Sequence, residues 1–80
     1  MKIKVIAFGY IADILGKGEL ELEDVSNTDL LKSTLYTKYP DLRKREYKIA
    51  VNQQIISDNI LLDENSEVVL LPPFAGGWII

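Results

Sequence analysis

Residues 67–80 read Glu67-Val68-Val69-Leu70-Leu71-Pro72-Pro73-Phe74-Ala75-Gly76-Gly77-Trp78-Ile79-Ile80, and this stretch decides how the rest of the chain is interpreted. It begins as a hydrophobic strand that stops at two prolines. Because proline lacks the N–H that a sheet ladder needs and favours an extended backbone, the segment after Leu71 is expected to leave the folded body as a semi-rigid arm. Gly76 and Gly77 have no Cβ, so they would fit a narrow channel supplied by a partner protein. The alternative is a frayed terminus that happens to contain glycines.

Composition narrows the kinds of protein to be considered. At 80 residues the chain fits one domain, and it contains neither cysteine nor histidine. Thiol nucleophiles, imidazole bases and the usual zinc sites are therefore excluded, so we expect no catalytic activity, metal or cofactor in the isolated chain. Twelve acidic residues against nine basic ones give a net charge of −3, which argues against a nucleic-acid partner. No apolar stretch approaches a membrane span of about 20 residues, and no signal-peptide core follows Met1, so a cytoplasmic protein is expected.

Alternation of apolar and polar residues predicts the strands. Residues 2–8 place Ile3, Val5 and Ala7 on one side, and residues 19–23 place two leucines on one side and three glutamates in water. Between these strands, residues 10–15 resemble a short helical turn that a left-handed Gly16 would stop. Further strands are expected at residues 48–52, 55–56 and 67–71, with a tight turn at 52–54.

One main helix is predicted after the second strand. Ser26-Asn27-Thr28-Asp29 has the form of a capping box, in which the Ser26 hydroxyl would accept a backbone N–H. Leu30, Leu31 and Leu35 follow at helical spacing, and Pro40 disfavours helical geometry at the residue before it, so the helix should end at about Lys38. Residues 41–46 are then expected to be a charged connection.

The order of these elements predicts an α+β fold of the β-grasp, or ubiquitin-like, type. In this arrangement the first and last strands lie parallel at the centre of a mixed sheet, and the main helix covers one face. Residues 1–71 would form the domain, and residues 72–80 an extended tail that contains the Gly-Gly pair and three further residues.

Strand parity also predicts an apolar surface on the outer face of the sheet. If Val68 and Leu70 point toward the helix, Val69 and Leu71 point away from it, and Ile6, Phe8 and Ala50 share their face. Together these side chains would form a patch of about a few hundred Å², which is typical of a protein–protein interface. The alternative is that the N-terminal turn or the tail covers the patch.

Three segments resemble a known family of sulfur carriers, the MoaD type of the MoaD/ThiS superfamily, which is the small subunit of molybdopterin synthase. They are residues 7–16, Ala50-Val51-Asn52-Gln53, and residues 67–77 with the Pro-Pro-x-x-Gly-Gly spacing. The thiamin sulfur carriers share the fold and the diglycine but are usually shorter and lack the proline pair, so they are the weaker match.

The resemblance implies chemistry at a main-chain carboxylate. An ATP-dependent enzyme would adenylate the carboxyl group of a terminal Gly77 and then deliver sulfur to it, giving a glycyl thiocarboxylate. A larger catalytic subunit would use that sulfur to build the dithiolene of molybdopterin, so the chain would be a carrier and not an enzyme. The residues implied in binding these partners are Ile6, Phe8, Val69, Leu71, Pro72, Pro73, Phe74, Ala75 and Gly76.

Trp78-Ile79-Ile80 leaves two interpretations open, because Gly77 has no free carboxylate while these residues are attached. Either a processing peptidase removes them and the chain serves a sulfur pathway, for molybdopterin or another product, or the chain is a capped, non-conjugated ubiquitin-like interaction module.

Overall fold

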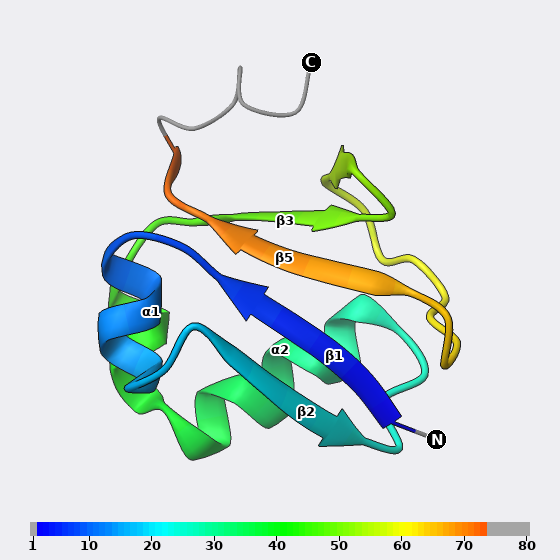
Figure 1. Ribbon diagram of the computed structural model, residues 1–80, viewed down its shortest axis with the longest axis horizontal. Coiled ribbons are helices and arrows are strands. Elements are labelled where there is room, and N and C mark those ends of the chain that lie inside the picture. The colour runs from blue at the N-terminus through cyan, green and yellow to red at the C-terminus, as the bar shows by residue number, and fades with distance from the viewer. Residues whose placement is uncertain (1, 74–80) are drawn as a thin grey trace.

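The computed structural model describes residues 2–73, and these form a five-stranded sheet with one long helix across one face (Figure 1). The strand order is β2-β1-β5-β3-β4. The strands are β1 (Lys2–Ala7), β2 (Glu19–Glu23), β3 (Lys48–Val51), β4 (Gln54–Ile56) and β5 (Glu67–Leu71), and the helices are α1 (Tyr10–Leu15), α2 (Thr28–Lys38) and the short 3-10 helix η1 (Pro40–Lys44). None of the helices in this described part is long and apolar enough to cross a membrane.

The first and last strands lie side by side at the centre of the sheet, as predicted. β1 runs parallel to β5, with Val5 opposite Val68 and Ala7 opposite Leu70. The pairs β1–β2, β3–β5 and β3–β4 are antiparallel. This mixed topology is that of the β-grasp fold. Because β1 and β5 are parallel, both strands end at the same edge of the domain, beside α1 (Figure 1).

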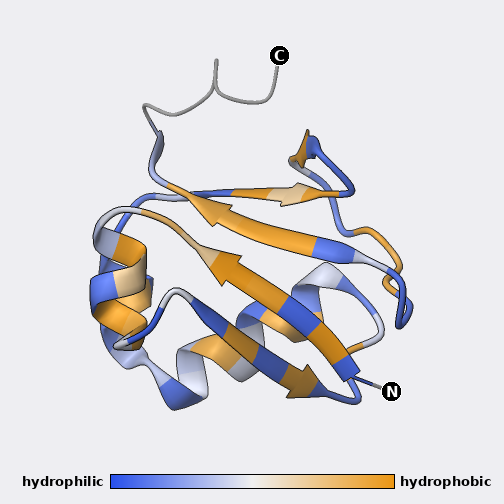
Figure 2. Ribbon diagram, viewed as in Figure 1, coloured by the Kyte–Doolittle hydropathy of each residue, from blue (hydrophilic) through white to orange (hydrophobic). Residues whose placement is uncertain are grey.

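The main core lies between the sheet and α2. Strand β2 alternates as expected, with its leucines buried and its glutamates exposed, whereas β5 is hydrophobic at every position after Glu67 (Figure 2). A strand that is apolar on both faces has covered side chains on both faces. Helix α2 contributes Leu31 and Leu35, both fully buried. Leu30, which was expected to share their stripe, is 40% exposed because it points about 100° away from Leu31 around the helix.

The start of α2 corrects one prediction. The N-cap is Asn27 and not Ser26: the Asn27 Oδ1 accepts a hydrogen bond from the Leu30 N–H at 2.8 Å. Asn27 has the extended backbone that a capping residue needs, and its amide oxygen reaches the third N–H of the helix as a hydroxyl would. The helix ends at Lys38, as predicted from Pro40.

One connection carries more structure than the sequence suggested, whereas the tight turn before β4 and the helix stop at Gly16 are as predicted. The stretch expected to be a charged connection contains η1, where Leu42 is fully buried against the core. The turn between β3 and β4 places Asn52 and Gln53 in left-handed conformations, with φ of 51° and 70°. Two successive residues with positive φ suit the twist of a tight hairpin. Gly16 ends α1 in the left-handed conformation that was predicted for it, with φ of 77°.

Candidate functional site

A row of apolar residues crosses the sheet on the face opposite α2. In register, Ile6 of β1 lies opposite Val69 of β5, Val69 opposite Ala50 of β3, and Ala50 opposite Ile55 of β4. We call these four residues the apolar row. Ala50, Val69 and Leu71 form a hydrophobic cluster that is separate from the main core, and Ile6 packs against it. The prediction that these side chains point away from the helix is therefore confirmed.

The exposure of this face differs from the sequence-based expectation. Val69 and Leu71 are only 4% and 1% exposed, and Ala50 is fully buried. The predicted patch of five accessible side chains is thus wrong in extent. Strand parity fixes the face on which a side chain lies and not how much of its surface is covered. The accessible apolar surface lies toward the ends of the row, where Ile6 is half-buried and Ile55 is 36% exposed.

Phe8 lies just beyond β1. It is 41% exposed and does not belong to the buried cluster of Ala50, Val69 and Leu71. Its N–H donates to the Leu70 carbonyl oxygen at 3.1 Å, which continues the contact between β1 and β5 past the end of the strand. Ile55 was not among the predicted site residues. The signal that could have found it is parity, because a two-residue turn places it opposite Ala50.

Charged side chains border the apolar row. At the β2 edge, Glu19 lies opposite Ile6, and its carboxylate is 3.5 Å from the Lys4 ammonium. Both side chains are more than half exposed, so this ion pair contributes little to stability. On the other side, Lys48 lies opposite Leu71 at the start of β3. An apolar strip with a charged border is the usual composition of a protein-binding surface.

The root of the tail lies at the end of β5. Pro72 is buried and Pro73 is half-buried. Pro72 packs against Gly9, the residue before α1: a Cβ built on Gly9 would lie 2.8 Å from the Pro72 Cγ. Gly9 was not among the predicted site residues, because nothing in the local pattern shows that residues 9 and 72 meet. The predicted partner-binding residues Phe74, Ala75 and Gly76, the predicted reacting residue Gly77, and the extension Trp78-Ile79-Ile80 lie outside the described residues.

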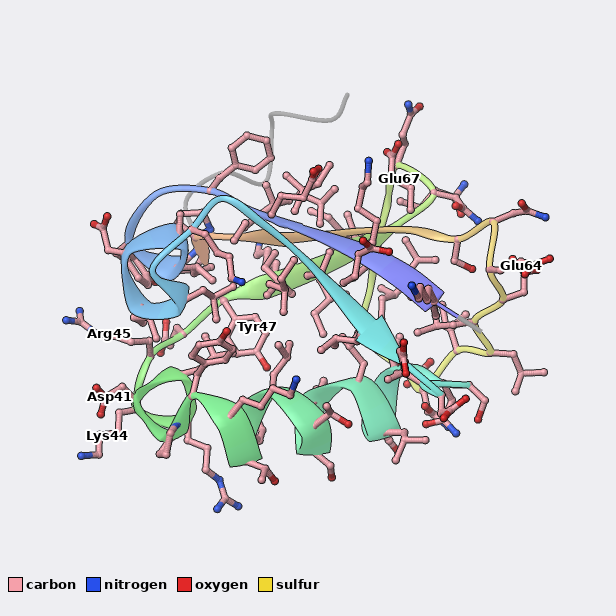
Figure 3. All side chains as sticks on the ribbon, turned by 60° about the horizontal axis from the view of Figure 1, so that its bottom comes forward. Asp41, Lys44, Arg45, Tyr47, Glu64 and Glu67 are labelled. Atoms are coloured by element: carbon pink, nitrogen blue, oxygen red, sulfur yellow. The ribbon has the colours of Figure 1, made fainter. Side chains whose placement is uncertain are left out.

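Among the described side chains, Tyr47 is the one group whose pKa is strongly shifted. Tyr47 lies between α2 and the sheet, where its hydroxyl is 2.5 Å from the Tyr36 hydroxyl (Figure 3). Burial, followed by the hydrogen bond and the charge of Tyr36, raises the pKa of Tyr47 well above its usual range. It therefore stays protonated at neutral pH and has a structural role. Within residues 2–73, no three potential metal ligands of the His, Cys, Asp or Glu type come together.

The sequence is similar to a known protein family and to several named relatives. A model of the ThiS family matches residues 5–77. The chain is 32% identical over 83 residues to the molybdopterin synthase sulfur carrier subunit of Caenorhabditis briggsae, with 96% of this chain and 99% of that protein covered. It is also 32% identical over 82 residues, with the same coverage, to the protein of that name from Mycobacterium tuberculosis.

Solved structures give the same fold. A putative molybdopterin converting factor, subunit 1, from Pyrococcus furiosus aligns with a TM-score of 0.83 at 21% identity, over 91% of this chain and 98% of that chain. The small archaeal modifier protein 1 from Methanosarcina acetivorans aligns with a TM-score of 0.73 at 29% identity, over 95% and 96% of the two chains.

Proposed function

Because the chain belongs to the ThiS family, we propose that it is the sulfur carrier subunit of a molybdopterin synthase and carries a thiocarboxylate on Gly77 once Trp78-Ile79-Ile80 has been removed. The relatives named for this role are 32% identical over nearly the whole of both chains, so the likeness extends to the sequence and is not confined to the fold. In this role the chain is not an enzyme by itself. Its partners are a large catalytic subunit, an ATP-dependent activating enzyme and a processing peptidase.

The main support for the proposal is the residue at which the family match ends. The match begins in β1 and ends at Gly77, the second glycine of the pair, so the last three residues lie outside it. The match also includes β5, whose end fixes the origin of the tail at Pro72. Six residues from Pro72 to Gly77 reach about 20 Å when extended, which suffices to enter a recessed site of a partner.

The proposed chemistry uses the C-terminal carboxylate of trimmed Gly77. A carboxylate oxygen attacks the α-phosphorus of ATP, the bond to pyrophosphate breaks, and an acyl adenylate forms. Hydrosulfide, the simplest sulfur nucleophile, then attacks the carbonyl carbon, and AMP leaves with the electron pair of the broken C–O bond. The product is a thiocarboxylate, in which sulfur replaces one carboxylate oxygen. The partners supply the acid and base groups, since this chain has no cysteine or histidine.

Docking is assigned to the outer face of the sheet. The ends of the apolar row, Ile6 and Ile55, are accessible on the face that also holds Leu71, the residue before the tail. Phe8, which follows β1 and is 41% exposed, is proposed to join them. A partner that covers this face would hold the origin of the tail at a fixed distance from its own site. Positioning of this kind converts a bimolecular transfer into a step within one complex.

A second candidate function follows from the likeness to a small archaeal modifier protein. In that case the activated carbonyl carbon of Gly77 would be transferred to an amine of another protein. The two functions share adenylation and differ in the nucleophile, so the acceptor distinguishes them.

The test compares two forms of the chain, residues 1–77 and residues 1–80. Each is incubated with an activating enzyme of this class, ATP and hydrosulfide, and its intact mass is followed. The trimmed form is expected to gain about 16 Da, the replacement of one oxygen by sulfur, and the full chain is expected to stay unchanged. An unmodified trimmed form, with an enzyme shown to be active on its usual carrier, would contradict the proposal. Sulfur on Ile80 of the full chain would show that glycine is not required.

A further inference from the structure

The start of the tail makes a close contact with the folded body where Pro72 packs against Gly9. A Cβ added to Gly9 would lie 2.8 Å from the Pro72 Cγ and 3.7 Å from its Cδ. The first distance is shorter than real Cβ contacts, so a side chain at position 9 would force Pro72 or the turn that holds Gly9 to shift. Gly9 also has φ of 60° and ψ of −140°, a backbone conformation that is essentially restricted to glycine.

The backbone on the Pro72 side of this contact is fixed. The Phe8 N–H donates to the Leu70 carbonyl oxygen at 3.1 Å, and Lys48 of β3 pairs with Leu71. Pro72 follows directly, is buried, and has a φ restrained by its ring. The last residue of the sheet and the first residue of the tail therefore share one rigid environment.

The backbone on the Gly9 side is equally restrained. Ile11 and Leu15 anchor α1 in the core. The Tyr10 hydroxyl donates to the Glu46 carbonyl oxygen, and the Arg45 guanidinium lies 5.3 Å from the centre of the Tyr10 ring. Arg45 lies at the end of the domain opposite Glu64 (Figure 3). Because α1 is tied to the core and to the segment before β3, a Cβ on Gly9 is expected to move Pro72 and the tail rather than α1.

We propose that Gly9 is a positioning residue for the carrier tail: it lets Pro72 pack against the turn between β1 and α1, and this contact sets the direction in which the chain leaves the sheet. The inference rests on the proposed carrier function. Five residues from Pro73 to Gly77 extend at most about 17 Å, so a change of about 20° at the root moves the end of an extended arm by about 6 Å. Misplacement of a reacting group by even about 1 Å can slow a transfer about 100-fold.

The chain offers a matched control for this idea. Gly16 also has a positive φ, 77°, but a Cβ there would meet nothing within 4 Å. Gly16→Ala therefore introduces left-handed strain without a clash, whereas Gly9→Ala introduces both. A third variant, Pro72→Ala, removes the ring that contacts Gly9 and leaves α1 intact, so it keeps the idea testable where Gly9→Ala fails to fold.

The first experiment measures the direction of the tail in the isolated chain, as a distance between two spin labels. The chain has no cysteine, so Lys38→Cys with Gly77→Cys gives one pair of spin labels in the full chain. We expect Gly9→Ala and Pro72→Ala to broaden the label–label distance distribution or shift it by several Å, and Gly16→Ala to leave it unchanged. The same distribution in all variants would overturn the inference.

The second experiment reads the consequence for transfer, using residues 1–77 with the activating enzyme, ATP and hydrosulfide. Gly9→Ala is expected to lower kcat about tenfold with KM for the carrier within about twofold, because docking uses the outer sheet face and transfer uses the tail. Gly16→Ala should keep both parameters within about twofold. Equal effects of Gly9→Ala and Gly16→Ala on kcat would contradict a positioning role. A parent form that accepts no sulfur would count against the proposed function, and the distance distributions would still decide the role of Gly9.

Discussion

Asn52 and Glu67 are joined by two reciprocal hydrogen bonds. The Asn52 N–H donates to the Glu67 carbonyl oxygen at 2.9 Å, and the Glu67 N–H donates to the Asn52 Oδ1, also at 2.9 Å. They extend the β3–β5 ladder by one step, since Val51 is already opposite Val68. A turn residue in a left-handed conformation is thereby tied to the first residue of the central strand.

Replacing Asn52 with Ala should lower the free energy of unfolding by about 2 kcal/mol, because the Glu67 N–H loses its acceptor and alanine tolerates positive φ poorly. Asn52→Asp is the matched control. It keeps an acceptor oxygen and a residue that tolerates the left-handed region, so its loss should stay below about 1 kcal/mol. Urea unfolding at neutral pH measures both values, and equal losses would mean that the side-chain hydrogen bond contributes nothing.

Replacing Gln53 with Gly should raise the free energy of unfolding by about 0.5–1 kcal/mol. Gln53 has φ of 70°, and glycine reaches this conformation without a steric cost. The neighbouring substitution Gln54→Gly lies in β4, whose extended backbone gains nothing from glycine, and it should destabilise the chain by a similar amount. Destabilisation by both glycines in thermal unfolding would show that the turn is not strained.

Under the proposed function, Phe8→Ala should weaken the complex with a large synthase subunit at least about tenfold while changing the stability of the isolated chain by less than about 1 kcal/mol. Phe8 is 41% exposed, so its truncation leaves no closed cavity. Leu70→Ala, on the core face of β5 and fully buried, should instead cost about 2–5 kcal/mol of stability. Calorimetric titration and urea unfolding separate the two effects. A loss of several kcal/mol for Phe8→Ala alone would place Phe8 in the core.

Ile55→Glu should also weaken that complex, because it puts a carboxylate at the accessible end of the apolar row. Leu61→Glu is the control: Leu61 is 82% exposed but pairs with Asn27 at the start of α2, away from the outer face. Titration of both variants with the same partner should show a change of about tenfold or more for Ile55→Glu and less than about twofold for Leu61→Glu. Similar affinities for the two variants would limit the interface to the β1 and β5 side of the sheet.

Because Tyr47 is partly buried and hydrogen-bonded to Tyr36, we expect the free energy of unfolding to fall at alkaline pH. Burial and the hydrogen bond raise the pKa of Tyr47 in the folded chain above the ordinary value of 10.0, which the unfolded chain keeps. Above that pH the unfolded state loses a proton that the folded state retains, so the free energy of unfolding falls as pH rises. Tyr47→Phe should flatten this decline, whereas Tyr39→Phe, which alters a residue outside the pair, should not. Urea unfolding at a series of pH values above 9 measures the slopes, and parallel slopes for Tyr47→Phe and the parent would contradict the assignment.

Most of the fold could be predicted from the sequence because its signals are local. The strict alternation of residues 19–23, the proline after Tyr39 and the glycine after Leu15 each fix an element boundary without reference to distant residues. The N-cap was misassigned for the same reason. Ser26 and Asn27 both carry a suitable oxygen, and only the path of the chain from β2 decides which of them meets the Leu30 N–H.

The candidate site was predictable in orientation and not in detail. Parity placed Ile6, Val69 and Leu71 on the outer face, since side chains alternate along a strand. Parity does not give exposure, which depends on everything that packs around a side chain, so the burial of Val69 and Leu71 was missed. The contact between Gly9 and Pro72 depends on the parallel register of β1 and β5, which no local pattern encodes.

The pairing of β1 with β5 also orders events during synthesis. Val5 can pair with Val68 only after β5 has been synthesised. The native sheet therefore depends on contacts between distant parts of the chain and forms only after β5 has left the ribosome. Nascent or truncated chains that end before β5 lack both the central strand of the sheet and Pro72, which follows it. Under the proposed function, the carrier tail is therefore present only in chains whose central strand pair can form.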